Sequence, residues 1–384
     1  MRVVIAAVVL VAAFAGLQQA MGCAVQSNLD FGQGFLADGR ALGVVDQNLV
    51  RIPLAGGTAT SIAPIDIPWR SSTAFNPDGT LAVLTDQHDL GSDCLGRRST
   101  VLFSTETGAP IHKWNASTQV LAGLDAGWVT EGPDYRLIPW ETPERAHRLD
   151  FDFPEGTSIY RVAAAGNTLA LFDGRSGDRF WIVDLHGTEA ALRPGASEHR
   201  LPDGPSDLAA VSLTRDGRSL AVLLSDWDST DKSTSWSLAR LDLEAGPAVW
   251  TTLWTHTDQD YHWRHHNVAA MPDGWIVTLA HDAYWVPNEG PAALLFHTKG
   301  TIAGTASADA LGAVFVTHEF NRLETIQLVG TNGSLGQALT AEGKDWVLSD
   351  ATMAPGRPSP AVAEVLPLIL LALAMALRRP IRRP

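Results

Sequence analysis

Cysteine is scarce in this sequence, with only Cys23 and Cys94 among 384 residues. A chain of this length with two cysteines has neither a disulfide framework nor a cysteine-rich zinc domain. Helical periodicity is also nearly absent between the two ends of the chain, which favours an all-β fold. Apolar residues make up 45% and charged residues 18%, so the chain can bury a sizeable core and is not disordered as a whole.

Positive charge is the second shortage, because 28 Lys and Arg face 42 Asp and Glu, for a net charge of −14. The two ends hold some of the positive charge: residues 1–29 carry +1 and residues 354–384 carry +4, which leaves −19 on residues 30–353. Such a surface repels phosphate. We therefore expect no nucleic-acid partner and no docking of this segment on anionic lipid.

The first 22 residues have the pattern of a signal peptide. Arg2 is followed by an apolar run and by small residues suited to cleavage. The segment Ala20–Cys23 resembles a bacterial lipobox, which implies a lipoprotein with Cys23 lipidated. The alternative is a disulfide between Cys23 and Cys94 in an oxidising compartment. Both interpretations predict export.

The C-terminal residues form a second targeting pattern. Residues 353–360 are a Pro-rich linker, residues 361–377 are apolar, and four arginines follow within residues 378–383. The hydrophobic tail with its basic end, residues 361–384, resembles the C-terminal sorting tails of secreted bacterial proteins. It predicts a membrane-anchored protein of the cell envelope or cell surface, with the preceding residues outside the cytoplasm.

The body of the chain repeats a strand, a tight turn, a second strand and an acidic residue. Asp-Gly turns suit tight hairpins. The second strands are nearly continuously apolar, as in buried strands. The acidic residues after them are Asp46, Asp86, Glu131, Asp173, Asp226, Asp282 and Glu319. Their mean spacing is near 45 residues, the length of a four-stranded propeller blade. In the sixth repeat we expect the third strand at Ala292–His297.

The repeated turns carry a more specific resemblance. Phe75–Val83, with the sequence FNPDGTLAV, resembles the Ser-Pro-Asp-Gly hairpin of YVTN-type and WD40-like β-propellers, and Met271–Val277 is similar. The resemblance implies a β-propeller over residues 31–350, with seven four-stranded blades, or else six or eight. It implies little about function, because propellers include both enzymes and binding proteins.

In a propeller, the acidic residues would lie at one mouth of the central channel. They could bind a cation or a basic ligand, or they could cap the turns that follow them. The loops of the sixth blade add histidines at this mouth. Imidazoles and carboxylates are ligands for divalent transition metals. The candidate metal ligands are His262, His265, His266, His281 and Asp282.

These histidines also allow acid–base catalysis. The order His265, His266, Asn267 before a Pro-Asp-Gly turn resembles one blade of bacterial arylsulfotransferases. That resemblance implies a transferase or hydrolase that uses histidines of the blade-six loops, with or without a metal. Whether the chain is an enzyme stays open, and no cofactor beyond a divalent metal is predicted.

Tryptophan is concentrated in the same region, with seven of thirteen between residues 227 and 285. Trp236 and Trp275 fall within strands and should pack between blades. Trp227, Trp263 and Trp285 fall in predicted loops, where rings beside carboxylates suit sugars or cations. The predicted ligand-binding residues are Asp226, Trp227, Asp228, Trp263, Asp282, Trp285 and Glu319. The predicted function is an exported scaffold that binds an unidentified protein, small molecule or glycan.

Overall fold

The computed structural model describes residues 35–37, 39–45, 48–64, 72–88, 97–114, 119–131, 134–151, 153, 157–174, 178–187, 189–192, 199–202, 207–244, 249–258, 266–308, 311–318, 322–340 and 346–348. The predicted signal peptide, linker and tail lie outside these residues, as do Cys23 and Cys94. All regular structure in the described part is β-strand. It contains no helix long and apolar enough to cross a membrane.

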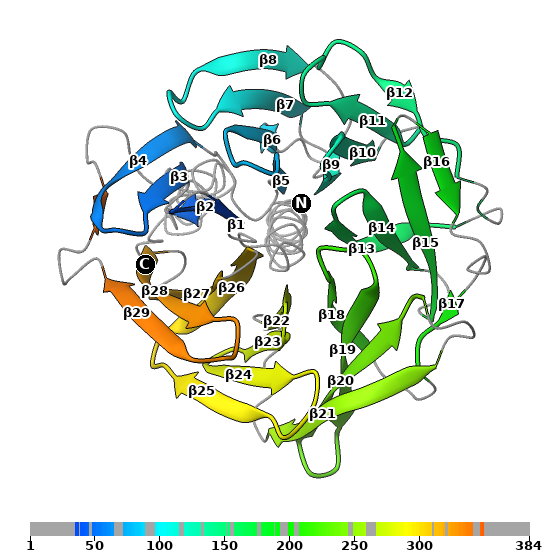
Figure 1. Cartoon of the computed structure of the whole chain (residues 1–384), viewed down its shortest axis with the longest axis vertical. Coiled ribbons are helices and arrows are strands. Elements are labelled where there is room, and N and C mark those ends of the chain that lie inside the picture. The colour runs from blue at the N-terminus through cyan, green and yellow to red at the C-terminus, as the bar shows by residue number, and fades with distance from the viewer. Residues whose placement is uncertain are drawn as a thin grey trace, which may run out of the picture.

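The strands form seven antiparallel sheets arranged in a ring, which is a seven-bladed β-propeller (Figure 1). Each blade takes its four strands from one continuous stretch of chain. Blades one to three are β1 (Phe35–Ala37), β2 (Arg40–Val45), β3 (Asn48–Pro53) and β4 (Gly57–Pro64); β5 (Ser72–Phe75), β6 (Leu81–His88), β7 (Arg97–Ser104) and β8 (Pro110–Trp114); and β9 (Gln119–Gly123), β10 (Gly127–Glu131), β11 (Arg136–Pro139) and β12 (His147–Arg148).

Blades four to seven continue the order, with β17 (His199–Arg200) as an extra strand paired with β15 in blade four. Their strands are β13 (Ile159–Ala165), β14 (Thr168–Asp173), β15 (Arg179–His186) and β16 (Glu189–Leu192); β18 (Asp207–Leu213), β19 (Ser219–Asp228), β20 (Ser233–Asp242) and β21 (Trp250–Asp258); β22 (His266–Met271), β23 (Gly274–Leu279), β24 (Asp282–Pro287) and β25 (Ala293–His297); and β26 (Thr301–Ala308), β27 (Leu311–His318), β28 (Arg322–Gly330) and β29 (Leu335–Thr340). The first strand of each blade is innermost in the ring (Figure 1).

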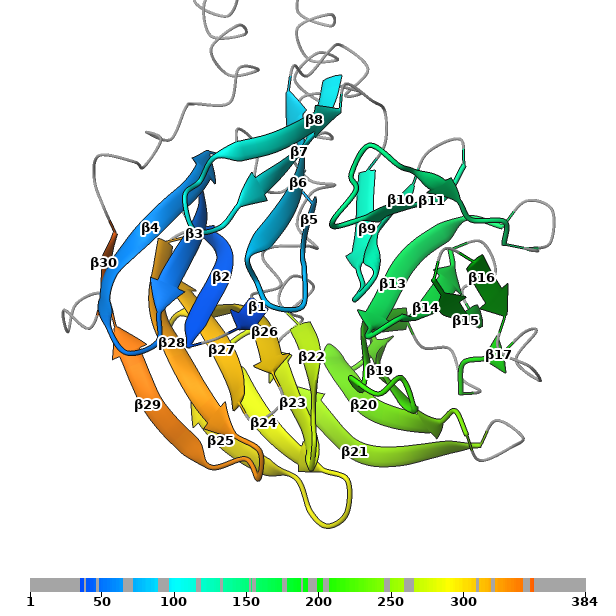
Figure 2. The same ribbon diagram turned by 45° about the horizontal axis from the view of Figure 1, so that its top comes forward.

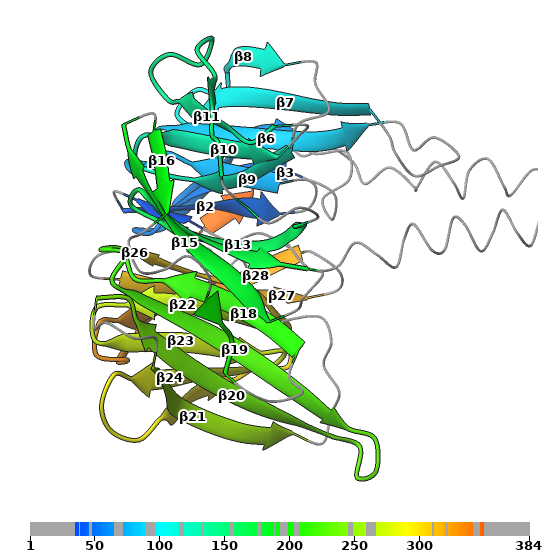
Figure 3. The same ribbon diagram turned by 90° about the vertical axis from the view of Figure 1, so that its right-hand side faces the viewer.

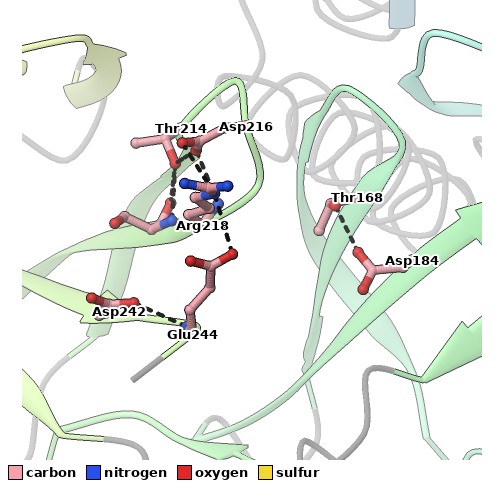
Figure 4. Close-up of polar contacts among 8 residues, drawn as sticks. Thr168, Asp184, Thr214, Asp216, Arg218, Asp242 and Glu244 are labelled. Carbon is pink, nitrogen blue, oxygen red and sulfur yellow. Dashed lines mark hydrogen bonds and ion pairs between the residues drawn. The ribbon is translucent and has the colours of Figure 1, made fainter. Parts of the chain in front are cut away.

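The Asp-Gly turns join the first and second strands of their blades. Gly79 and Gly217 have φ angles of 68° and 67°, which glycine adopts without strain. The carboxylate of Asp216 accepts hydrogen bonds from the Thr214 hydroxyl (2.7 Å) and the Arg218 backbone N–H (3.0 Å), and Figure 4 shows this turn beside blade four. This Asp-Gly turn is therefore stabilised by its own aspartate, and Asp78 bonds the Thr80 backbone N–H (2.9 Å) in the same way.

The core consists of seven apolar clusters, one at each junction between neighbouring blades. Central strands contribute to two clusters because both of their faces are buried, as all six residues of β14 and β23 show. Trp236 and Trp275 lie in the cluster between blades five and six, which confirms that they pack between blades.

The last described strand, β30 (Trp346–Leu348), pairs in parallel with β4 of blade one. Figure 2 shows it at the outer edge of that blade, next to blade seven. The chain thus returns from blade seven to blade one, and the apolar cluster between these two blades closes the ring.

The prediction of seven four-stranded blades is confirmed. One strand assignment was wrong: the third strand of blade six is β24 (Asp282–Pro287), and the segment around Ala292–His297 is the fourth strand, β25. The physical reason is a tight turn at Ala280 and His281, with Ala280 at a φ of 45°, which brings the chain straight back along β23.

Candidate functional site

The start of β22 and the turn between β23 and β24 lie at the same end of blade six. His266 begins β22 and pairs with Leu279 at the end of β23, so it lies next to the turn of Ala280 and His281. Asp282 begins β24 and pairs with His297 at the end of β25. The structure therefore brings together three predicted site residues, His266, His281 and Asp282, and adds His297, which the sequence did not single out.

The acidic residues at the ends of the second strands do not share one role. Asp173 is fully buried, forms a 3.0 Å ion pair with Arg179 and accepts a hydrogen bond from the Ser158 backbone N–H. Here the acid holds its own blade together, as a structural device does. Asp226 is exposed on β19, and Asp282 is partly buried. Glu319 lies outside the described residues, and the same holds for the side chains of Asp46, Asp86 and Glu131.

The hairpin of β19 and β20 is the most prominent feature of this end. Its strands have ten residues each, the longest in the described part of the chain, and it projects from the edge of the molecule (Figure 3). Asp226, Trp227 and Asp228 are exposed near its tip. Hydrogen bonds from Thr230, chiefly from its backbone N–H, lower the pKa of the Asp228 carboxyl, so this acid is used locally in the turn.

Alternation along the strands places these three residues on opposite faces of the hairpin. Leu223 belongs to the cluster facing blade six and Leu224 to the cluster facing blade four. Because side chains alternate with a period of two, Trp227 lies on the blade-six side, and Asp226 and Asp228 lie on the blade-four side. The predicted group of ligands is therefore split between two faces.

Two cross-strand rows cover the blade-six side of the hairpin. One row consists of Trp227, Thr234 and Asp258, and the next consists of Ser225, Trp236 and His256. Across from them stand the side chains of blade six. We call the whole set the five–six face: Trp227, Thr234, Trp236, His256, Asp258, Asp282, Tyr284 and His297.

Aromatic and titratable groups are interleaved in the five–six face. The His256 ring stacks on Trp254, with centroids 5.6 Å apart, and its Nε2 is 3.3 Å from the Tyr284 hydroxyl. Burial, the negative charges of Asp282 and Asp258, and a hydrogen bond with Asp282 raise the pKa of Tyr284 to about 12. Carboxylates from two neighbouring blades therefore raise the pKa of the same phenol.

The histidines of blade six are oriented by oxygen acceptors. Nδ1 of His297 donates to the Asp282 carboxylate at 2.7 Å, and Nδ1 of His281 donates to the Gly300 carbonyl at 2.7 Å. Their ring centroids are 6.3 Å apart. Such contacts fix a ring and its tautomer, as in metal sites and acid–base pairs.

The predicted metal set is only partly described. His266 lies beside Trp236, with ring centroids 5.5 Å apart, whereas His262 and His265 lie outside the described residues. Within the residues that the structure describes, no group of three or more His, Cys, Asp or Glu side chains could hold a metal ion. The metal site thus stays a prediction.

Of the predicted ligands Trp263 and Trp285, the structure describes Trp285. Trp285 lies in β24 rather than in a loop, and only 7% of it is exposed, because it packs in the cluster between blades six and seven. Trp263 lies outside the described residues. Tyr284 of β24 also lies beside His256 of β21 and close to Asp258, and the sequence did not indicate this tyrosine. The signal that could have linked them is the register between β20, β21 and β24, which the sequence alone does not give.

The solved structures that are similar to this chain share little of its sequence. No protein-family model and no curated protein matches the chain. Among solved structures, the Cps50 (Swd1) β-propeller domain of Myceliophteria thermophila is 14% identical with a TM-score of 0.48, over 74% of this chain and 93% of that domain. A putative 6-phosphogluconolactonase from Bacteroides uniformis is 12% identical with a TM-score of 0.49, over 80% of this chain and 95% of that one. At these identities the likeness concerns the fold alone.

Proposed function

We propose that the chain is an exported, envelope-held binding protein that takes its ligand at the five–six face. The observation that carries this proposal is the projecting hairpin of blade five. Residues beyond Ser225 on β19 leave the core, yet they continue as a paired strand that carries Trp227, which is 40% exposed. A partly exposed indole on an ordered strand offers apolar surface to a partner, and tryptophan is enriched among the residues that dominate binding.

The charged groups of the five–six face also support its role as the binding site. Asp258 and Asp282 come from neighbouring blades and both act on Tyr284. Rings and carboxylates side by side provide stacking and hydrogen-bond acceptors for a polar ligand. The five–six face therefore combines the elements of a binding site on a rigid scaffold.

The test is a thermal-shift screen of the full-length chain against glycans, peptides and metabolites. A ligand that raises Tm should lose this effect in Trp227→Ala. The matched control is Leu335→Ala, which removes another exposed apolar side chain from blade seven, on the outer strand β29. Ligands that respond equally to both variants, or to neither, would place binding elsewhere.

Export and anchoring are the second part of the proposal. They rest on the sequences of residues 1–22 and 361–384. Mass spectrometry of the mature protein should find cleavage before Cys23 or within the residues that precede it, and, where Cys23 carries no lipid, a chain ending at Asp350 should leave the membrane fraction. An unprocessed chain in the cytoplasm would contradict this part and leave the binding proposal intact.

A transfer or hydrolysis reaction is the second candidate, and the Asp282–His297 contact favours it. A carboxylate that orients an imidazole is the arrangement of a general base. Turnover of an ester, sulfate ester or phosphate ester should disappear in His297→Gln and persist in His186→Gln, an exposed histidine of blade four. Activity that survives His297→Gln would exclude this residue as the base.

A further inference from the structure

The proposed function leaves the class of ligand open, and the hydrogen-bonding groups of the five–six face narrow it. Resting on that proposal, we infer that the ligand is a carbohydrate, stacked on Trp227 and hydrogen bonded to Thr234, Trp236 and Asp258. Three features support this assignment: the order of side chains across the hairpin, two buried polar groups, and the balance of donors and acceptors.

The row of Trp227, Thr234 and Asp258 has the profile of a sugar subsite. Its three members lie on adjacent strands β19, β20 and β21, so a small hydroxyl side chain stands between an indole and a carboxylate. Neighbouring strands are about 4.8 Å apart, which sets the backbone positions of Trp227 and Asp258 about 10 Å apart along the row. A ring stacked on the indole can then turn its hydroxyls toward the carboxylate.

Two polar groups on this side of β20 are buried without a hydrogen bond. Thr234 is 1% exposed and Trp236 is 3% exposed, and neither Thr234 Oγ1 nor Trp236 Nε1 has a hydrogen-bond partner in the part of the chain that the structure describes. The two residues are two positions apart, so their side chains lie on the same face of the strand. A buried polar group without a partner costs stability, and a ligand that supplies the partner removes that cost.

The balance of donors and acceptors separates a carbohydrate from a cation. The indole N–H of Trp236 can only donate, and the ionised carboxylate of Asp258 can only accept. A guanidinium or an ammonium group has donors alone, so it would satisfy Asp258 and leave Trp236 unpaired. A sugar hydroxyl both donates and accepts, and so it can serve both groups. The five–six face is thus better matched to a polyol than to a cationic group alone.

The first test is binding of the full-length chain to a glycan array, followed by calorimetry with the strongest glycan on it. Trp227→Ala should weaken binding about threefold to tenfold, because ring stacking is lost. Asp258→Asn should also weaken binding. Asp242→Asn is its matched control, since it removes one charge at the opposite end of blade five. No binding to any glycan, or an affinity unchanged by Trp227→Ala, would overturn the inference.

Trp236→Phe provides a second readout, because it removes the N–H and keeps most of the ring. It should weaken glycan binding about threefold to tenfold and lower Tm of the ligand-free chain only by the loss of ring volume in the core. Trp275→Phe should lower Tm further and leave glycan binding unchanged, since Trp275 Nε1 donates to Asn288 Oδ1 at 3.2 Å in the free protein. A lower Tm for Trp236→Phe together with unchanged affinity would assign this residue to the core alone and count against the inference.

A peptide with three arginines, and the same peptide with citrullines, separates this inference from the proposed function. Binding of the arginine peptide that depends on Trp227, with no glycan bound, would overturn the carbohydrate class and retain a binding protein. If neither class binds in a manner that depends on Trp227, the proposed function fails as well. Glycan binding that depends on Trp227 supports both.

Discussion

At the residue scale, Tyr284 has the most perturbed environment in the five–six face. It is largely buried, and Asp282 and Asp258 lie near its hydroxyl, so ionisation is opposed in the folded state and the pKa rises from 10.0 to about 12. The phenol ionises near pH 10 in the unfolded chain, so that between pH 10 and 12 the unfolded state binds fewer protons than the folded state. Stability linked to this group is present below pH 10 and is lost as the pH rises through this window.

We predict that Asp282→Asn lowers the pKa of Tyr284, because it removes a nearby negative charge. Absorbance at the phenolate band, followed from pH 9 to 13, measures the change. Tyr160, another tyrosine of the described part, has a pKa raised mainly by burial and lies in blade four, so its titration should not move. An unchanged Tyr284 titration in Asp282→Asn would show that burial and Asp258, and not Asp282, cause the shift.

Asp173 illustrates a different use of a carboxylate. It is fully buried and paired with Arg179 at 3.0 Å. We predict that Asp173→Ala destabilises the protein by about 3–5 kcal/mol, because a partly buried guanidinium loses its charged partner. Asp178→Ala is the control, since Asp178 pairs with Arg200 at an exposed position, where such pairs contribute about 0–1 kcal/mol. Urea unfolding of both variants measures the difference, and similar losses would contradict the structural role of Asp173.

At the scale of the element, the Asp-Gly hairpin also forms contacts between blades. Gly217 has a φ of 67°, and a Cβ built on it would lie 2.6 Å from Thr168 Oγ1 of blade four, which donates a 2.7 Å hydrogen bond to Asp184 (Figure 4). Glycine is therefore required at this position for two reasons. The backbone is left-handed, and the neighbouring blade leaves no room for a side chain.

Gly217→Ala should cost about 2–4 kcal/mol, the sum of left-handed strain and overpacking. Gly187→Ala isolates the first cause, because Gly187 has a φ of 65° with no atom within 4 Å of a built Cβ. Its cost should be about 1–2 kcal/mol. The difference in unfolding free energy between the two variants measures the contact between the blades. Equal losses would mean that blade four yields to the new methyl group.

The elements differ in how well the sequence predicts them. Asp78 and Asp216 signal their turns directly, because each aspartate bonds the residues that follow it, and these turns predicted the repeat and the number of blades. The third strand of blade six escaped prediction because its turn uses Ala280 with a φ of 45°, where no glycine or asparagine signals the bend. The pairing of Thr234 with Asp258 depends on a register shift near Ala239, which no local pattern records.

At the scale of the whole molecule, the ring is closed in two ways. Ala41 and Ile52 of blade one pack with Phe315 and Ile326 of blade seven in an apolar cluster, and β30 adds a strand to the outer edge of blade one. The four antiparallel strands of blade one come from the N-terminal side of the body, and the C-terminal side adds β30 to the edge of this sheet. Packing therefore carries most of the closure, and β30 reinforces it from outside.

The apolar cluster and β30 should therefore contribute unequally to the free energy of unfolding. A chain ending at Thr340 lacks β30 and should be less stable than one ending at Asp350 by about 1–3 kcal/mol, the net value of a few backbone hydrogen bonds. Ile326→Ala should cost about 2–5 kcal/mol, because it opens a cavity in the closing cluster. Urea unfolding of the three proteins distinguishes the contributions. If the chain ending at Thr340 fails to fold while Ile326→Ala is tolerated, β30 is the main closure, and the C-terminal segment then controls the whole propeller.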